Sequence, residues 1–297
     1  MASVQKKSIS GRIFNIVNCF IVTLLIFVTL YPMLYVIFAS LSEPRYLLSH
    51  EGLLLYPVGK MTLKGYELVL KNPNIINGFR NSIFYVALGT SINVILTSMG
   101  AFVLTRKHFA IRRLCSLLIL LTMFFSGGMI PTFFVVKNLG LYDSFWALVL
   151  PNAISVYNMI IMRTFFFGIP ESLEESANLE GANDWQVFTR IILPLSMPVI
   201  AVMILYYGVG HWNAWFGAMI YLRDRTKYPL QLFLREILLQ DQMESMAVST
   251  QEMAEESLFK ELIQYSSIIV TTLPILCIYP LLQRYFVQGV MIGAVKG

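Results

Sequence analysis

The densest group of side chains able to contact a polar ligand lies near residue 210. It consists of Tyr207, His211, Trp212, Asn213 and Trp215. Aromatic faces combined with hydroxyl, amide or imidazole groups suit a saccharide. Tyr207, His211 and Trp215 are spaced by four residues, so a helix would present all three on one side. Two interpretations stay open: a stripe that contacts a passing sugar, or an aromatic belt and helix packing near a membrane interface. We favour the belt or packing.

Residues that would predict catalysis are missing. The three histidines, at positions 50, 108 and 211, are too scattered for a catalytic or metal cluster, and GxxxxGK[ST], HExxH and GxSxG motifs are absent. The cysteines at positions 19, 115 and 277 form no CxxC pair and lie in apolar runs. We therefore expect no metal site, no cofactor and no ATP hydrolysis in this chain.

The segment 170–194 has the clearest local signals. A capping box that begins at Ser172 predicts a helix just after a proline. Gly181 can adopt the left-handed conformation that ends such a helix. The capping pattern repeats at Asn183 and predicts a second helix, which Pro194 interrupts. A helix–glycine–helix element of this kind suits the transfer of force from an external partner to membrane-spanning helices.

The composition places these motifs in a membrane protein. Of the 297 residues, 57% are hydrophobic and 13% are charged, whereas an ordinary soluble domain has about 25% charged residues. A soluble enzyme and a disordered chain are therefore excluded. We expect an all-α membrane protein whose spanning helices are residues 13–42, 81–105, 114–136, 144–166, 194–222 and 262–285. In the third of these, Gly127, Gly128 and Pro131 are expected to serve close helix packing rather than a hinge.

The distribution of basic residues predicts the orientation. With residues 1–12 in the cytoplasm, that side holds eleven lysines and arginines outside the long loops, against Lys137 alone on the other side. Both termini are therefore expected to be cytoplasmic, including a tail at 291–297. The spanning domain at 13–290 would then have two long external loops, 43–80 and 223–261, and a cytoplasmic loop at 167–194. The net charge of +5 reflects this asymmetry and not nucleic-acid binding, because no basic cluster is interleaved with aromatic residues outside the apolar stretches.

The cytoplasmic loop also carries a family resemblance. Glu175-Ser176-Ala177, then Gly181 after three residues and Ile191-x-Leu193-Pro194 after nine more, resembles the EAA motif, E-A-A-x3-G-x9-I-x-L-P. That motif marks the permease subunits of bacterial binding-protein-dependent ABC importers. The chain departs from it at Ser176, where the family often has Ala, and at Glu180, where the sugar-importing branch often has Asp.

Other segments resemble the carbohydrate branch of that family, of which MalG is the best-known type. They are 163–170, 212–216, 228–232 and 283–297. The last helix and tail look closest to the branch that includes LplC and YtcP, whose members are linked to complex or uronate-containing oligosaccharides.

The resemblance implies a type I ABC importer permease of the MetI/MalG kind, with six spanning helices and a cytoplasmic coupling helix, in the bacterial cytoplasmic (inner) membrane. Its implied partners are a second homologous permease, an ATPase dimer that holds ATP and Mg, and an extracytoplasmic solute-binding protein that delivers a carbohydrate. The helix at 173–180 would sit in a groove of one ATPase. The residues implied in coupling are Glu174, Glu175, Ser176, Ala177, Glu180, Gly181, Ile191, Leu193 and Pro194, with Lys296 and Gly297 of the tail reaching the ATPase dimer.

Two other functions stay open. A permease for a non-sugar solute would use the same coupling loop. A six-helix membrane enzyme or sensor would need a catalytic or signalling residue in or beside the membrane, and the chain shows none.

Overall fold

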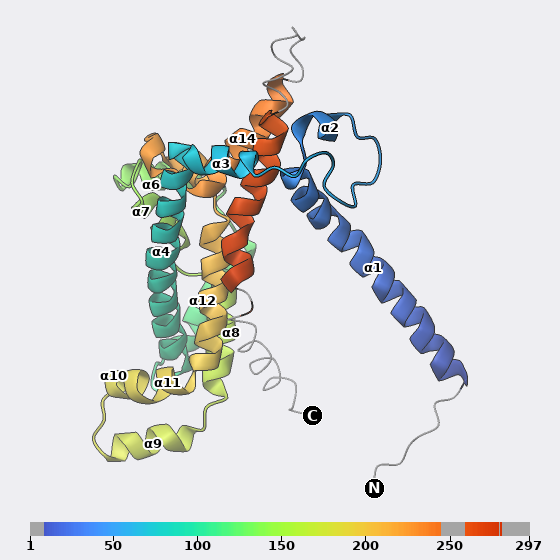
Figure 1. Cartoon of the computed structure of the whole chain (residues 1–297). Coiled ribbons are helices and arrows are strands. Elements are labelled where there is room, and N and C mark those ends of the chain that lie inside the picture. Colours follow the sequence, from blue (N-terminus) through green and yellow to red (C-terminus); the bar gives the residue numbers. More distant parts are fainter. Residues whose placement is uncertain (1–8, 245–258, 279, 281–297) are drawn as a thin grey trace. The chain divides into compact units, whose positions relative to one another are not determined.

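The computed structural model describes residues 9–244, 259–278 and 280 (Figure 1). All regular elements in this part of the chain are helices, so the all-α prediction is confirmed. The described residues form two compact units: 9–71 with 238–244 and 259–270, and 72–237 with 271–278 and 280. Each unit is described by itself.

The first unit is built on α1 (Ile9–Leu41), a helix of 33 residues. Its apolar length is sufficient to cross a bilayer. Two short helices follow, α2 (Pro44–Leu48) and α3 (Lys64–Lys71). The α3 helix contacts α1, and the hydroxyls of Ser40 and Tyr66 are 2.7 Å apart.

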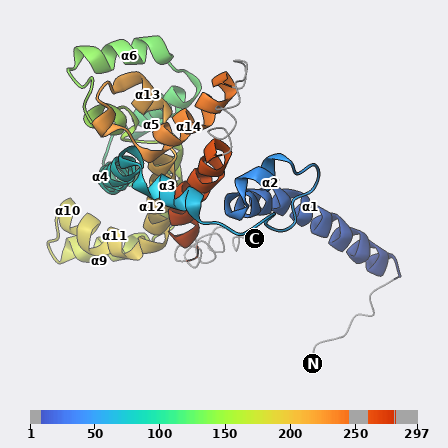
Figure 2. The same ribbon diagram turned by 45° about the horizontal axis from the view of Figure 1, so that its top comes forward.

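Three helices form the core of the second unit: α4 (Pro73–Thr105), α8 (Val156–Phe167) and α12 (Met197–Trp212). Each packs against the other two, and α4 and α12 lie side by side in both views (Figures 1 and 2). The buried face of α4 is rich in small residues, including Gly89, Ser98 and Ala101. Small side chains let helices approach closely, as is typical of packing within membranes.

The second spanning helix begins earlier than the sequence predicted. The charge-free stretch predicts a start at residue 81, after Arg80, whereas α4 begins at Pro73. Asn72 caps the helix by accepting the N–H of Asn74 at 2.9 Å, and Pro73 occupies a first-turn position where its missing N–H costs nothing. Arg80 is tolerated because its side chain is exposed. The preceding loop therefore ends at Asn72 rather than at residue 80.

The third and fourth predicted spans are broken rather than continuous. The third consists of α5 (Arg112–Phe124) and α6 (Met129–Asn138), bent by 116°. Gly128 has a φ of +84° at this break, and no atom lies within 4 Å of where its Cβ would be. The expectation of close packing at this glycine pair was wrong, because the glycines supply a turn. The fourth consists of α7 (Trp146–Val149), a 3-10 turn (Leu150–Asn152) and α8, bent by 52°.

The fifth predicted span is also divided. Its long part is α12, and α13 (Phe216–Tyr221) follows after a break. Among the described residues, three helices are long and apolar enough to cross a membrane. Three bent pairs, the third being residues 184–195 with α12, bring the set to six if each pair counts as one span. This arrangement agrees with the six-helix permease expected from the sequence.

Two further helices complete the described part. The α14 helix (Leu230–Glu244) lies in the predicted loop 223–261, and the last predicted span begins at Phe259 and is described to Ile278. The tail at 291–297, with Lys296 and Gly297, lies outside the described residues.

Candidate functional site

The segment between α8 and α12 folds into two arms. The first arm is α9 (Glu171–Leu179), which begins directly after Pro170. Pro170 occupies the N-cap position and no side chain caps the helix, so the capping box predicted at Ser172 does not form. Glu171 and Glu174 lie in the first turn, where the helix dipole favours negative charge.

Helix α9 ends as predicted, at a glycine in the left-handed conformation. Gly181 has a φ of +86°. The N–H of Ala182 donates to the carbonyl of Ala177 at 2.9 Å, and the N–H of Gly181 donates to that of Asn178 at 3.0 Å. These two bonds form the Schellman motif that ends helices at a left-handed glycine. The chain therefore reverses direction at this point.

The second arm begins with the predicted capping box at Asn183. Asn183 and Gln186 each accept the backbone N–H of the other through their side chains, at 2.9 and 3.0 Å. The short helix α10 (Asp184–Val187), a π-helical turn (Phe188–Ile192) and α11 (Leu193–Leu195) follow. Pro194 has no N–H to donate to the preceding turn, which accounts for the irregular helix before it. An 81° bend then leads into α12.

The second arm is packed into the core, whereas the first arm is mostly exposed. Val187, Phe188 and Ile192 are at most 4% exposed. They belong to a cluster contributed by α4, α8 and α12, and the ring of Phe188 lies 4.9 Å from that of Phe102. The second arm is therefore in direct contact with all three core helices.

Two ion pairs attach the first arm to the end of α4. Arg106 pairs with Glu174, and Lys107 pairs with Glu171. The first pair is largely buried, with side chains 11% and 21% exposed, while both members of the second are more than 60% exposed. The guanidinium of Arg106 also lies 4.1 Å from the centre of the Phe102 ring. Burial lowers the pKa of Arg106 from its ordinary value.

The remaining motif residues divide by exposure. Glu175, Ser176, Glu180, Gly181 and Pro194 are exposed, whereas Glu174, Ala177, Ile191 and Leu193 are half-buried. Leu179, at the end of α9, is 90% exposed, and Trp185 is 59% exposed. Residues of α9 and of the segment 105–112 line a cavity of about 240 Å³. An exposed leucine beside acidic residues is an arrangement that a protein partner can cover.

The sequence reasoning missed Arg106, Lys107 and Leu179. The basic residues at 106–113 were used only to predict the orientation of the chain in the membrane. The sequence feature that could have identified Arg106 and Lys107 is their charge complementarity with the acidic start of α9. The sequence does not show, however, which of these charges form pairs.

Two residues of the aromatic and polar group near residue 210 are held inside the second unit. The hydroxyl of Tyr207 bonds with Thr97 Oγ1 at 2.7 Å and accepts the N–H of Ser155 at 3.0 Å. The ring of His211 packs on Gly89, and its Nε2 lies 2.6 Å from Oδ1 of Asn93.

Asn93 extends this network to the break in the fourth span. Its amide donates to the carbonyls of Asn152 and Ala153 at 2.7 and 2.8 Å. Backbone groups freed by a broken helix need partners inside a membrane. Tyr207 and Asn93 supply those partners, so the contacts of Tyr207 and His211 are those of packing.

The other three residues of the group have separate surroundings. Trp212 is buried, and its Nε1 donates to the carbonyl of Thr271 at 3.0 Å. Trp215 lies beyond the end of α12 with Arg235 4.4 Å from its ring centre, and Asn213 is exposed. The structure therefore does not place Tyr207, His211 and Trp215 on one side of a continuous helix, because α12 ends at Trp212.

The comparisons with known proteins agree with this arrangement. Residues 75–292 match the family described as binding-protein-dependent transport system inner membrane component. The chain is 39% identical to the protein LplC of Bacillus subtilis over 97% of its own length and 96% of that protein. It is 38% identical to the polygalacturonan/rhamnogalacturonan transport system permease protein YtcP of the same organism, over 97% and 99% of the two lengths.

A solved structure is also similar. It is a bacterial ABC transporter involved in the import of the acidic polysaccharide alginate, with a TM-score of 0.86, 30% identity, and coverage of 95% of this chain and 100% of that chain. The family consists of transport components of the membrane and not of enzymes. The chain belongs to the family of binding-protein-dependent transport system inner membrane components.

Proposed function

We propose that this chain forms half of the translocation pathway of a carbohydrate ABC importer and that α9 is the helix through which an ATPase drives it. The observation that carries the coupling role is the division of the loop into an exposed arm and an anchored arm. Leu179 is 90% exposed, while Val187 and Phe188 are buried against the core helices. A partner that covers α9 can thus move α4, α8 and α12 together.

The orientation belongs to the same proposal. The ion pairs join residues 106–107 to α9, so α9 lies at the same end of the unit as the short loop 106–113, which is rich in Lys and Arg. Positive charge in short loops favours the cytoplasmic side. We place α9 and both termini there, where ATP is available to a partner.

The proposed partners are a second permease, an ATPase dimer and a binding protein that delivers the solute. Co-purification tests whether the chain assembles with them. The complex is extracted from native membranes in mild detergent and identified by mass spectrometry. We expect a second permease bearing the EAA motif and an ATPase subunit. Reproducible recovery of the folded chain alone would refute the importer assignment.

A matched pair of variants then tests α9 itself. Leu179→Ser should reduce the recovered ATPase at least several-fold, because it removes an exposed apolar anchor. Leu139→Ser is the control, since Leu139 is 67% exposed but follows α6, at the opposite end of the unit from α9 (Figure 2). Equal loss of ATPase in both variants, or in neither, would contradict the role of α9.

The carbohydrate is proposed to be an acidic oligosaccharide, by similarity to YtcP and to the alginate importer. Uptake of an oligogalacturonate is compared with uptake of the same oligosaccharide after its carboxyl groups are reduced to alcohols. We expect only the acidic form to be imported in a manner that depends on this chain. Import of both forms would refute selection for the carboxylate, and import of neither would favour another solute.

A further inference from the structure

The segment from Glu43 to Lys64 turns back along α1. The N–H of Leu54 donates to the hydroxyl of Tyr31 at 3.2 Å, and Tyr31 precedes the end of α1 at Leu41 by ten residues. At 1.5 Å per residue, the segment returns about 15 Å alongside the helix. Both of its ends stay at the helix terminus, where the N–H of Thr62 donates to the carbonyl of Leu41 at 3.0 Å. Figure 1 shows the segment beside this end of α1.

The tip of this segment, residues 50–57, has a fixed position on α1. Leu54 is 1% exposed and packs with Ala39 and Leu47. Tyr35 and Phe38 of α1 complete the contact. The side of the tip that faces α1 is therefore a small hydrophobic core.

The opposite side of the tip is apolar but uncovered. Leu53, Leu55 and Tyr56 are 70%, 62% and 69% exposed. Glu51 is the one acidic or basic residue between positions 50 and 57, apart from His50. Adjacent exposed large apolar side chains mark a surface that something other than water covers.

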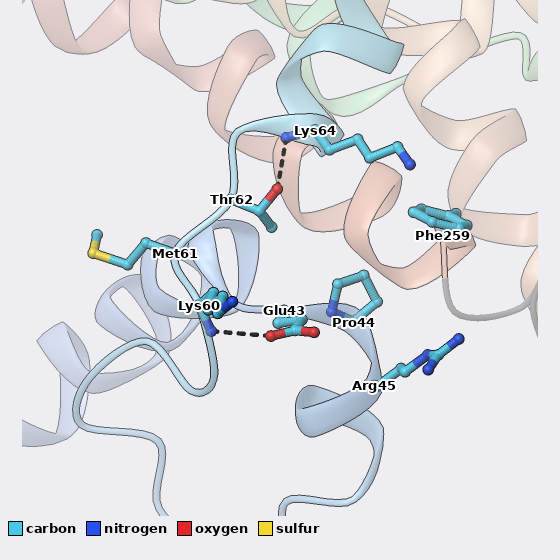
Figure 3. A pocket seen from close by; sticks show the side chains of 8 residues that line it. All are labelled: Glu43, Pro44, Arg45, Lys60, Met61, Thr62, Lys64 and Phe259. Atoms are coloured by element: carbon cyan, nitrogen blue, oxygen red, sulfur yellow. Dashed lines mark hydrogen bonds between the residues drawn. The ribbon is translucent and has the colours of Figure 1, made fainter.

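The base of the segment has the opposite character. Glu43, Arg45, Lys60 and Lys64 line an open cavity of about 520 Å³ there, and the ammonium of Lys64 lies 4.6 Å from the centre of the Phe259 ring (Figure 3). Polarity therefore changes along the segment, from a charged base at the end of α1 to an apolar tip farther back along it.

The length of α1 fixes the depth of the tip. Its 33 residues extend about 50 Å, which exceeds the roughly 30 Å of a hydrocarbon core. If the hydrocarbon begins at Ile13, the first residue of the apolar stretch, about twenty residues fill it and end near Pro32, next to Tyr31. The tip thus lies at the boundary between hydrocarbon and headgroups. It can lie no deeper, because irregular backbone exposed to lipid is not stable in the hydrocarbon.

We propose that residues 50–57 form an interfacial anchor that places Leu53, Leu55 and Tyr56 in the lipid at this boundary. Leucine side chains are favoured in the part of the acyl chains next to the headgroups, and tyrosine is favoured at the level of the headgroups. The charged base then faces water beyond the headgroups. This proposal depends on α1 crossing the membrane and not on the transported solute.

The experiment measures the depth of the tip in the assembled importer in liposomes. The three native cysteines are replaced by serine, and a nitroxide is attached to Leu55→Cys. Collision of the nitroxide with oxygen, which concentrates in lipid, is compared with collision with a water-soluble nickel chelate. The matched control is Glu67→Cys on α3 of the same unit, where the Glu67 side chain is 60% exposed.

We expect the oxygen-to-nickel collision ratio at position 55 to exceed that at position 67 several-fold. A ratio at position 55 equal to that at position 67 would place the tip in water and overturn the proposal. Low collision with both reagents would mean that a protein covers the tip, which would also overturn it. Leu53→Cys repeats the measurement, and recovery of the assembled complex shows that each labelled variant is folded.

Discussion

The buried pair between Arg106 and Glu174 should hold α9 against the end of α4. Removal of one partner leaves the other charge largely buried, at 11% or 21% exposure, without its counter-charge. The expected cost is about 1–3 kcal/mol, the desolvation penalty of an unpaired polar group. That free energy corresponds to about a 5- to 150-fold increase in the population in which α9 is detached.

Hydrogen exchange of the α9 backbone amides measures that population, because local opening sets their protection. The protein is purified without ATPase subunits so that α9 is uncovered. Glu174→Gln and Arg106→Gln should each lower protection of α9 by 5- to 150-fold, and the double variant by little more than one of them. Helix α12 serves as an internal reference.

The second ion pair supplies a matched control on the same helix. Glu171→Gln removes the partner of Lys107, but both side chains are more than 60% exposed. Exposed pairs contribute little, so protection should change by a few-fold at most. Equal effects of Glu171→Gln and Glu174→Gln, or additive effects in the double variant, would refute the argument that burial makes the Arg106–Glu174 pair the anchor.

Three further predictions follow from single positions. Gly181→Ala should lower exchange protection of α9 about 5- to 30-fold, because a left-handed φ costs a non-glycine residue roughly 1–2 kcal/mol; Gly140→Ala, equally left-handed and equally open, should leave α9 unchanged. Gly89→Ala would place a Cβ 2.5 Å from His211 Nε2 and should lower the melting temperature by several degrees, for a cost of about 1–3 kcal/mol, whereas Gly210→Ala on α12, with no atom within 4 Å, should not. The backbone N–H groups of Arg223 and Asp224 lower the pKa of Asp143 from its ordinary 3.8, so its stabilisation of the loop at 223–227 is complete above about pH 4 and declines as the pH falls through the lowered value. Exchange of that loop should therefore accelerate on acidification. The hydroxyl and the N–H of Thr226 likewise lower the pKa of Asp224 in the same loop, so Asp143→Asn should reduce the change and the double variant Asp143→Asn with Asp224→Asn should abolish it; a pH response unchanged by Asp143→Asn would exclude Asp143 as a source.

The sequence alone determined the class of the protein. Low charge and long apolar runs require a membrane, because such a chain cannot cover itself with polar groups in water. Local motifs were also readable: the capping box at Asn183 and the left-handed Gly181 form as predicted, since both depend on residues within one or two turns. The EAA spacing led to the family to which the chain belongs.

Tertiary structure decided what depends on residues far apart in the chain. The capping box at Ser172 was wrong for a local reason, because Pro170 already sets the first turn. The start of α4 before Arg80, by contrast, depends on the exposure of that side chain in the folded chain. The four-residue spacing of Tyr207, His211 and Trp215 assumed one continuous helix, but α12 ends at Trp212. Whether a polar side chain contacts a ligand or forms hydrogen bonds with the free backbone groups of a broken helix depends on which elements pack against it. The anchoring of Glu174 by Arg106, 68 residues away, likewise depends on a meeting of two loops that no local pattern encodes.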